Sequence, residues 1–426
     1  MNSKFEKNLN ELVEAKVITP EILKNITDYY SSNTSKKTNW LFTVFGVLGA
    51  LLSGLGIILI VAHNWDTLPK NIKTILAFTP LVIGQLAIGY SFFKNKSNTW
   101  KEASSTFLFF AIGATISLVS QVYNIPGEMS SFLLTWLVLA APLLYLMRSN
   151  TIAVFHLIIA TCYACNLGYF NSNVPWLYLA LFIWVLPHYY SLIKQQPTAN
   201  ITSIFNWFLP LSLVIALGAF IGSKDTIGFC MYMALFGLLY NLGKLPRLSN
   251  QKLRANGYLI IGSLGSIFIL MFTTFNWFWK DTATGNLSTQ EIGVTLFLNA
   301  AALLVLLYLY FKKQLKSFNL FQYTFLIFGL IYTGLQSAGV VPVVLINLLI
   351  FTLGLSTVKI GTNKQNYGIL NYGLLIITVL IACRFFDTDL DFVVRGILFI
   401  LVGVGFFLAN YMLLKKQQNE KNNLIN

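Results

Sequence analysis

Charged side chains are scarce in this sequence. Only 10% of its 426 residues are Asp, Glu, Lys or Arg, whereas 56% are hydrophobic and the mean hydropathy is +0.67. A soluble domain carries about 25% charged residues, so a chain this poor in charge cannot cover its surface with polar groups. The composition excludes a soluble globular protein and predicts one that lies in a membrane.

The sequence also lacks the short alternating segments of a membrane β-barrel. Its apolar runs are about 18 residues or longer, enough for a helix to cross a hydrocarbon layer of ~30 Å, whereas barrel strands need about ten residues. We therefore predict an all-α, polytopic helical membrane protein with about fourteen transmembrane helices. The apolar runs on either side of Arg148, and those on either side of Ala338, are so tightly joined that each pair could be a single helix. A count of about twelve or thirteen helices is therefore the alternative. The expected spans are 39–62, 72–93, 103–124, 130–148, 150–169, 174–193, 201–222, 226–244, 256–277, 291–311, 318–335, 339–357, 367–384 and 392–414.

Three parts follow from this assignment. Residues 1–38 are a cytoplasmic amphipathic helical hairpin, residues 39–150 a four-helix membrane segment, and residues 151–426 a further bundle of about ten helices. In the hairpin, Thr19 is a predicted helix cap and Pro20 a first-turn residue. No basic start followed by an apolar core is present, so we expect no cleavable signal peptide. The hairpin is interpreted as a cap packed on the inner loops, with a regulatory or partner-binding module as the alternative.

Acidic residues are fewer than basic ones, 15 against 29, and the formal net charge is +14. Because Lys and Arg are retained in cytoplasmic loops, we place both termini in the cytoplasm and the chain in the cell inner membrane. Basic residues spread over many inner loops suit contact with anionic membrane lipid. Nucleic acid is not an expected partner, since it would need a basic surface on one soluble domain. On this topology only six Lys and Arg face outward: Lys70, Lys73, Lys224, Lys280, Arg384 and Arg395.

Cysteine and histidine are rare, with four and three copies. Cys162 and Cys165 lie inside an apolar span with no second Cys or His pair to complete a zinc site. We interpret them as small buried hydrophobic residues and expect no metal or cofactor. His156 is a mid-span candidate for a proton relay, but no Asp or Glu lies deep in an expected span to accept its proton.

Small residues mark one face of the first expected span. Gly46, Ala50 and Gly54 follow one another at intervals of four residues, a spacing that lets membrane helices approach closely. We expect this face to pack within the chain. The alternative is that it forms the seam of a homo-oligomer.

A first group of polar residues is predicted at the outer side. "HNWDTLP" places Trp65 and Asp66 after the first span, and the third span ends in Gln121 and Tyr123 and is followed by Glu128. We expect these five residues to rim an outward-facing polar pocket between the first and third spans. The alternative is that Asp66 only caps the second span, where a carboxylate meets unpaired N–H groups.

A second group lies near the C-terminus. "CRFFDTDLDFVVR" gathers Arg384, Asp387, Asp389, Asp391 and Arg395 around one outer turn. Arg395 falls about one helical turn inside the last expected span, where an unpaired charge is costly. We therefore expect it to pair with Asp391, four residues earlier.

The first third of the chain combines several motifs: "HNWDTLP", "GATISLVSQVYNIPGE" and "TWLVLAAPLLYL". In combination they resemble the uncharacterised bacterial polytopic membrane family DUF2157, over about residues 5–150. The resemblance implies an inner-membrane protein of many spans with no assigned activity. It supplies no catalytic residues.

Three functions fit an outward polar cluster on an apolar helical bundle. We rank first a transporter or flippase for an amphiphilic or envelope-related substrate, although the spans lack the mid-membrane carboxylates typical of ion-driven carriers. A non-catalytic scaffold or regulator of envelope proteins comes second. A membrane-embedded transferase acting on a lipid-linked substrate, with Asp66 or Glu128 as base, comes last. A non-enzymatic role is thus favoured.

The predicted topology can be tested with reporter fusions. A reporter that is active only in the cytoplasm should be active when fused after Asn98 or Asn250, because basic loops stay inside. A reporter fused after Gly285 should behave as external. An external signal at Asn250 would show the topology to be wrong.

Overall fold

The computed structural model describes most of the chain, in segments. These are residues 9, 11–15, 17–33, 65–171, 173–221, 227–281, 289–312, 319–335, 338–385, 391–397, 399–400, 403–405 and 407. The chain divides into two units, Met1–Leu76 and Ala77–Asn426, and each is described separately below.

The first unit contains the expected N-terminal helix α2 (Pro20–Asn33). The backbone N–H of Ile22 donates to Thr19 Oγ1 at 3.4 Å, and the N–H of Leu23 donates to the Thr19 carbonyl at 3.0 Å. Thr19 is therefore the helix cap and Pro20 the first helical residue, as predicted. The small residues Gly46, Ala50 and Gly54 lie outside the described residues, so a seam at that face stays a prediction.

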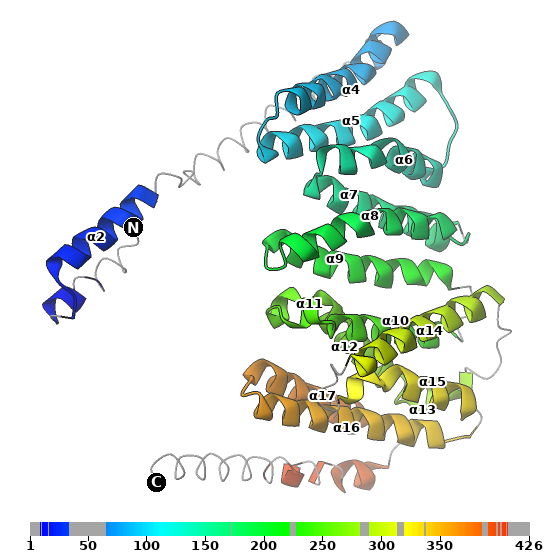
Figure 1. Cartoon of the computed structure of the whole chain (residues 1–426). Coiled ribbons are helices and arrows are strands. Elements are labelled where there is room, and N and C mark those ends of the chain that lie inside the picture. Colours follow the sequence, from blue (N-terminus) through cyan, green and yellow to red (C-terminus); the bar gives the residue numbers. More distant parts are fainter. Residues whose placement is uncertain are drawn as a thin grey trace. The chain divides into compact units, whose positions relative to one another are not determined.

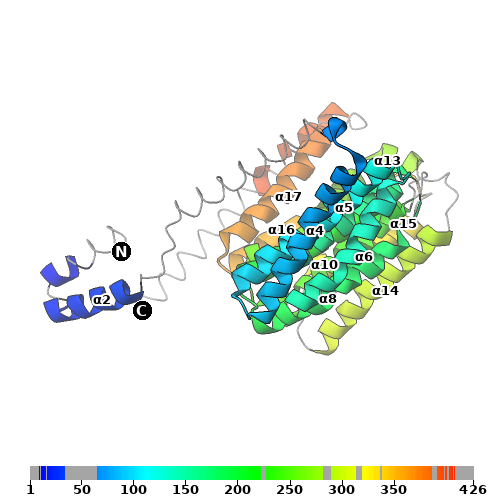
Figure 2. The ribbon, with the colours of Figure 1, turned by 90° about the horizontal axis from the view of Figure 1, so that it is seen from above.

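Helices joined by short turns make up the second unit, and its described residues contain no strand (Figures 1 and 2). Helix α4 (Lys70–Phe93) enters it from the first unit. The following elements are α5 (Asn98–Tyr123), α6 (Met129–Met147), α7 (Asn150–Cys165) with η3 (Asn166–Phe170), α8 (Trp176–Gln195), α9 (Asn200–Leu217) with η4 (Gly218–Phe220), α10 (Gly228–Gly243), α11 (Pro246–Ser249), η5 (Leu253–Ala255), α12 (Gly257–Phe272), α13 (Asn276–Asp281), α14 (Thr289–Phe311), η7 (Leu320–Gln322), α15 (Thr324–Gly334), α16 (Val341–Asn363) and α17 (Tyr367–Phe385).

The helices have the length and composition of membrane spans. In the described part of the chain, nine helices are long and apolar enough to cross a membrane, and α10, α12 and α15 are shorter apolar helices. Each expected span from 72–93 to 367–384 coincides with one of them. The expected span 39–62 and most of 392–414 lie outside the described residues. An all-α polytopic membrane protein is therefore confirmed.

Two tight turns separate the runs that the sequence left ambiguous. Arg148 adopts a left-handed conformation with φ 50° and ends α6, and its N–H bonds to the Leu144 carbonyl. Gly339, with φ 64°, lies between α15 and α16, where glycine has no Cβ to resist a positive φ. The runs around Arg148 and around Ala338 are thus two helices each.

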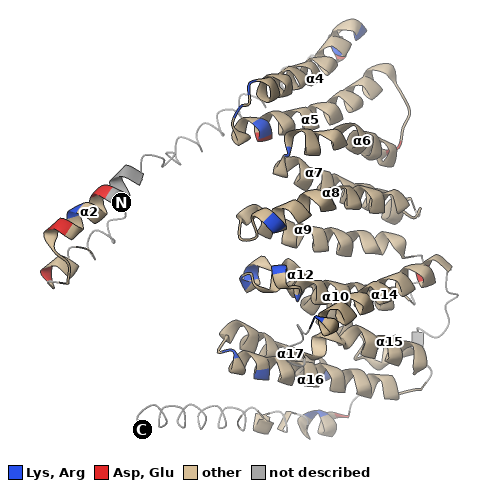
Figure 3. Cartoon of the chain, viewed as in Figure 1, with Lys and Arg blue, Asp and Glu red and all other residues tan. Residues whose placement is uncertain are grey.

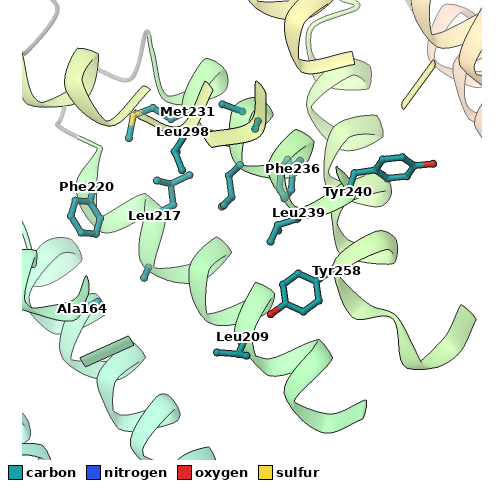
Figure 4. Packing of buried hydrophobic residues seen from close by; sticks show 14 of the residues in the cluster. Ala164, Leu209, Leu217, Phe220, Met231, Phe236, Leu239, Tyr240, Tyr258 and Leu298 are labelled. Atoms are coloured by element: carbon teal, nitrogen blue, oxygen red, sulfur yellow. The ribbon is translucent and has the colours of Figure 1, made fainter. Parts of the chain in front are cut away.

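The core of the second unit centres on α10. This helix packs against α12, α14 and α15, while α5, α6 and α7 contact one another in sequence and α16 pairs with α17. Figure 4 shows Met231, Phe236 and Leu239 of α10 among side chains from the neighbouring helices. A Cβ on Gly262 of α12 would lie 2.5 Å from the Tyr240 backbone nitrogen, so these two helices are in close contact.

Large apolar side chains remain exposed on the outside. On α14, Phe297 is 71% exposed, Leu304 66% and Phe311 75%. A soluble protein rarely shows such a continuous apolar face. On a spanning helix this face contacts lipid, so membrane lipid is a partner of the chain.

Charges gather at the ends of the helices (Figure 3). Arg148, Lys194, Lys244 and Lys364 stand at the C-terminal ends of α6, α8, α10 and α16, and we call this side of the second unit the basic end. Acidic Glu291 lies in the first turn of α14, at the other end. This division is the one that the predicted topology requires. Which end faces the cytoplasm stays a prediction.

The α16–α17 contact generates a stability prediction. A Cβ at Gly373 would meet the Val358 backbone nitrogen at 2.6 Å, whereas nothing lies within 4 Å of a Cβ at Gly293 on α14. We expect Gly373→Ala to destabilise by about 1–3 kcal/mol because the helices must move apart. Gly293→Ala should be neutral or stabilising by about 0.5–1 kcal/mol, since alanine favours helix.

Thermal melting of the purified protein in detergent measures both effects. Equal melting temperatures for the two variants would contradict a close α16–α17 contact.

Candidate functional site

The five residues of the predicted outward pocket are all described, but they belong to two different units. Gln121 and Tyr123 lie at the end of α5 and Glu128 directly precedes α6, and all three side chains are exposed. Ser130 Oγ donates to Glu128 Oε2 at 3.4 Å. Trp65 and Asp66, the other two residues of the predicted pocket, belong to the first unit. The five-residue pocket therefore stays a prediction.

The alternative role for Asp66, as the cap of α4, is wrong. Asp66 lies in η2 (Trp65–Thr67), and its side chain is exposed. Helix α4 begins at Lys70, and its first backbone hydrogen bond runs from Lys73 N–H to the Pro69 carbonyl at 3.1 Å. Pro69 therefore occupies the N-cap position, because its carbonyl accepts the first intrahelical hydrogen bond of α4. Asp66 stands three residues earlier.

In the predicted C-terminal charge cluster, Arg384 joins two segments of the chain. Arg384 Nη2 donates to Thr274 Oγ1 at 3.0 Å, and its guanidinium lies 4.7 Å from the centre of the Phe275 ring. These contacts tie the end of α17 to the segment after α12.

The described contacts of Arg395 in that cluster involve backbone atoms. Arg395 Nη1 donates to the Phe385 carbonyl at 3.3 Å, and the Arg395 N–H donates to the Asp391 carbonyl at 3.1 Å. Asp387 and Asp389 lie outside the described residues. The side-chain pair of Asp391 and Arg395 stays a prediction.

A cavity of about 940 Å³ lies at the basic end of the second unit. It is bounded by α10, α12, α16 and α17 and by the short elements α11, η5 and η7. Its lining residues are Tyr240, Lys244, Pro246, Ser249, Asn250, Gln251, Leu253, Asn256, Leu259, Ile260, Ser263, Leu264, Leu309, Asn319, Phe321, Gln322, Thr357, Ile360, Lys364, Asn366, Gly368, Ile369 and Tyr372. None of the described lining residues is acidic.

Buried amides shape the polar floor of this cavity. Asn256 caps α12 by accepting from the Leu259 N–H at 3.1 Å, and its Nδ2 donates to the Gly243 carbonyl at 2.8 Å. Asn319 Nδ2 donates to the Tyr240 hydroxyl at 2.7 Å. Because these amides are buried, their hydrogen bonds fix the loops between the helices.

Two lysines stand at the mouth of the cavity. Lys244 is the C-terminal cap of α10 and Lys364 the C-terminal cap of α16, positions where a cation is stabilised by the helix dipole. Lys244 Nζ lies 5.1 Å from the centre of the Tyr240 ring. Burial, and secondly the positive charge of Lys364, lower the pKa of Lys244 from its usual 10.5 to about 8. Lys364 is therefore close enough for the two ammonium groups to repel each other.

An acid does lie at the basic end, but it serves another helix. The Glu102 carboxylate accepts hydrogen bonds from the backbone N–H groups of Asn150 at 2.8 Å and Thr151 at 3.1 Å, and from the Ser149 hydroxyl. It thereby satisfies the open N–H groups at the start of α7. Glu102 does not line the cavity.

One wall of the cavity is aromatic. The Phe321 ring stacks on Tyr240, with centroids 5.3 Å apart, and on Tyr372, with centroids 6.4 Å apart. The Tyr372 hydroxyl is buried beside Ser263, without a well-formed hydrogen bond among the described residues. Leaving such a group unpaired costs about 1–3 kcal/mol. The hydroxyl is therefore available to a ligand.

Another part of the cavity lining is aliphatic. Ile260 and Leu264 of α12, Leu309 of α14 and Ile369 of α17 line it. Leu264 is 50% exposed on the outer surface of the unit, so this wall continues into the surface that contacts lipid. The lining of the cavity thus combines cations and hydrogen-bond donors with apolar side chains.

Among known proteins, a family model matches the N-terminal part of the chain, which does not include the cavity. Residues 10–153 match the family model described as predicted membrane protein (DUF2157). The resemblance based on the N-terminal motifs is therefore confirmed. The DUF2157 match ends within the first turn of α7, so no cavity residue lies in it. No curated protein and no solved structure matches the chain.

Sequence reasoning missed this cavity downstream of the DUF2157 match. Lys244 was assigned only to topology, and Asn319 and Tyr372 were not singled out. The available signal was a set of amides beside short spans, at Asn250, Gln251 and Asn319. The proton-relay candidate His156 is completely buried in α7 and does not line the cavity.

The lowered pKa of Lys244 can be measured by its reactivity. Only the neutral amine is acylated, so Lys244 labelling should rise with pH to a midpoint near 8. Lys364→Gln removes a positive charge, so the midpoint should move upward. Mass spectrometry of samples pulse-labelled with acetic anhydride gives both profiles. A midpoint near 10.5 in the unmodified chain would contradict a desolvated Lys244.

Proposed function

We propose that this protein handles an amphiphilic substrate in the membrane, as a transporter or flippase does. The observation that carries this proposal is the cavity at the basic end, whose lining combines Lys244 and buried amides with the apolar side chains of Ile260 and Leu264. Its volume of about 940 Å³ lies at the upper end of the range of about 300–1,000 Å³ found for ligand pockets. A molecule with a polar head and an apolar tail matches both parts of this lining.

The position of the cavity supports entry of the substrate from one side. The cavity is built from loops and helix ends at the basic end, which the topology prediction assigns to the cytoplasm. The proposed substrate therefore enters from the inner side.

Two other functions find less support in the geometry. A transferase needs a general base near its acceptor, and the described cavity residues include no carboxylate or histidine. A scaffold does not need a cavity with a buried unpaired hydroxyl such as that of Tyr372. A transporter-like function is therefore favoured over a scaffold. A scaffold would be favoured if the protein does not speed lipid flipping.

Transport can be tested in proteoliposomes of phosphatidylethanolamine and phosphatidylglycerol. Fluorescent head-group-bearing analogues of both lipids are reduced by dithionite only in the outer leaflet, so flipping appears as additional loss of fluorescence. We expect the protein to speed this loss well beyond that in protein-free vesicles. Ile260→Trp should reduce the gain because the indole narrows the cavity.

Phe268→Trp is the matched control. Phe268 lies on the same helix α12 but is 69% exposed and does not line the cavity. It should leave the rate unchanged, and both variants should melt at the temperature of the unmodified protein. A rate equal to that of protein-free vesicles would overturn the proposal and favour the scaffold.

A further inference from the structure

The described part of the chain places no acidic side chain in the lining of the cavity beside Lys244 and Lys364. These two lysines stand close enough for the charge of Lys364 to act on Lys244. Glu102, an acid at the same end of the unit, is engaged at the start of α7. Two like charges beside one cavity favour an anion between them.

Hydrogen-bond donors accompany these charges. The Tyr372 hydroxyl is buried beside Ser263 but makes no well-formed hydrogen bond among the described residues, so it can donate to a ligand. The Tyr240 oxygen accepts from Asn319 at 2.7 Å, which leaves the Tyr240 hydrogen to donate. Asn366 Oδ1 accepts from the Ile369 N–H at 3.2 Å, so its Nδ2 group also remains a donor.

A site made of donors and cations, with no carboxylate, suits a group that only accepts hydrogen bonds. A phosphate group has four oxygens, of which three share the charge in a monoester and two in a diester, so it can accept from both ammonium groups and from further donors at once. A carboxylate has two oxygens and would leave part of this set unused. Phosphate is therefore the better match.

We propose that the cavity at the basic end binds the phosphate head group of an anionic amphiphile, with Lys244 and Lys364 as counter-charges and Tyr372 as a donor. The aliphatic wall of Ile260 and Leu264 receives the first part of the acyl chain. This inference rests on the proposed function for the ligand being an amphiphile. Binding itself does not require transport.

The two lysines also have a structural role, which the test must separate from binding. Each caps the C-terminus of a helix, so its removal can lower stability through the lost dipole interaction alone. A dipole role predicts a lower melting temperature without ligand and no change in affinity. A head-group site predicts lost affinity whatever happens to the melting temperature.

Binding is measured with the full chain in dodecylmaltoside, which carries no phosphate. Dihexanoyl phosphatidylglycerol, dihexanoyl phosphatidylcholine and glycerol 3-phosphate are titrated separately. The rise in melting temperature with concentration gives the affinity, and native mass spectrometry gives the stoichiometry. We expect one tight site for phosphatidylglycerol and weaker binding of phosphatidylcholine, whose choline cation is repelled by the lysines.

Variants assign the site to residues. Lys244→Gln and Lys364→Gln should each weaken phosphatidylglycerol binding by about tenfold or more, as expected for a lost hydrogen bond to a charged group. Tyr372→Phe should weaken it by a smaller factor, because one donor is lost. Lys194→Gln is the control: Lys194 is exposed at the same end, in the last turn of α8, and lies outside the cavity.

Each outcome decides the inference. Equal affinity for phosphatidylglycerol and phosphatidylcholine, or equal losses in Lys244→Gln and Lys194→Gln, would overturn it. Binding of glycerol 3-phosphate as tight as that of phosphatidylglycerol keeps the phosphate site but identifies a soluble ester as its ligand. Weaker binding of glycerol 3-phosphate assigns the site to lipid.

The result is separable from the proposed function. Lysine-dependent binding without any flipping would keep the head-group site and remove the transport proposal. Flipping that is reduced by Ile260→Trp but indifferent to Lys244→Gln and to head-group charge would do the reverse.

Discussion

The absence of water in the hydrocarbon layer is the constraint on which the rest of this structure depends. An unpaired backbone N–H or C=O there costs several kcal/mol, so the chain is helical wherever it crosses. Turns and helix ends, whose backbone groups need other partners, are confined to the two faces of the bundle. Ser149, Asn256 and Asn319 each accept a backbone N–H at such an end. Polar chemistry therefore collects at the ends of the helices, and the cavity lies at one of them.

Within the layer, the helices are held by close approach and by a few polar pairs, because lipid removes the hydrophobic drive for their association. Gly262 brings α12 against α10. Asn241 of α10 donates to the Gln322 carbonyl at 3.1 Å and accepts from Gln322 Nε2 at 3.3 Å. Tyr189 donates to Asn206 at 2.7 Å. These buried bonds tie helix ends to neighbouring loops and so hold the cavity open between well-fixed elements.

The spans could be predicted because a hydrocarbon layer of ~30 Å requires about 20 apolar residues in a crossing helix, and most of the described helices have such a run. Thr19 and Pro20 could be predicted because a cap depends on neighbouring residues only. The cavity could not, since Tyr240, Asn319 and Tyr372 come from segments far apart in the sequence and are joined only by packing. The capping role of Asp66 was wrong because the local turn places Pro69 at the helix start. A pattern read residue by residue cannot show such convergence.

The same physics also explains why the sequence alone does not distinguish Lys244 from other basic residues at helix ends. Basic residues at one end of a helical bundle are expected for topology, since an anionic leaflet retains them there. They are also expected at helix C-termini, where they meet the dipole. A ligand site made of cations at that end carries the same sequence signature as either effect. What separates Lys244 from Lys194 is its surroundings: a desolvated ammonium, a second lysine acting on it, and a buried unpaired hydroxyl in the lining of the same cavity. Three-dimensional placement, and not residue type, marks this lysine as a candidate binding residue.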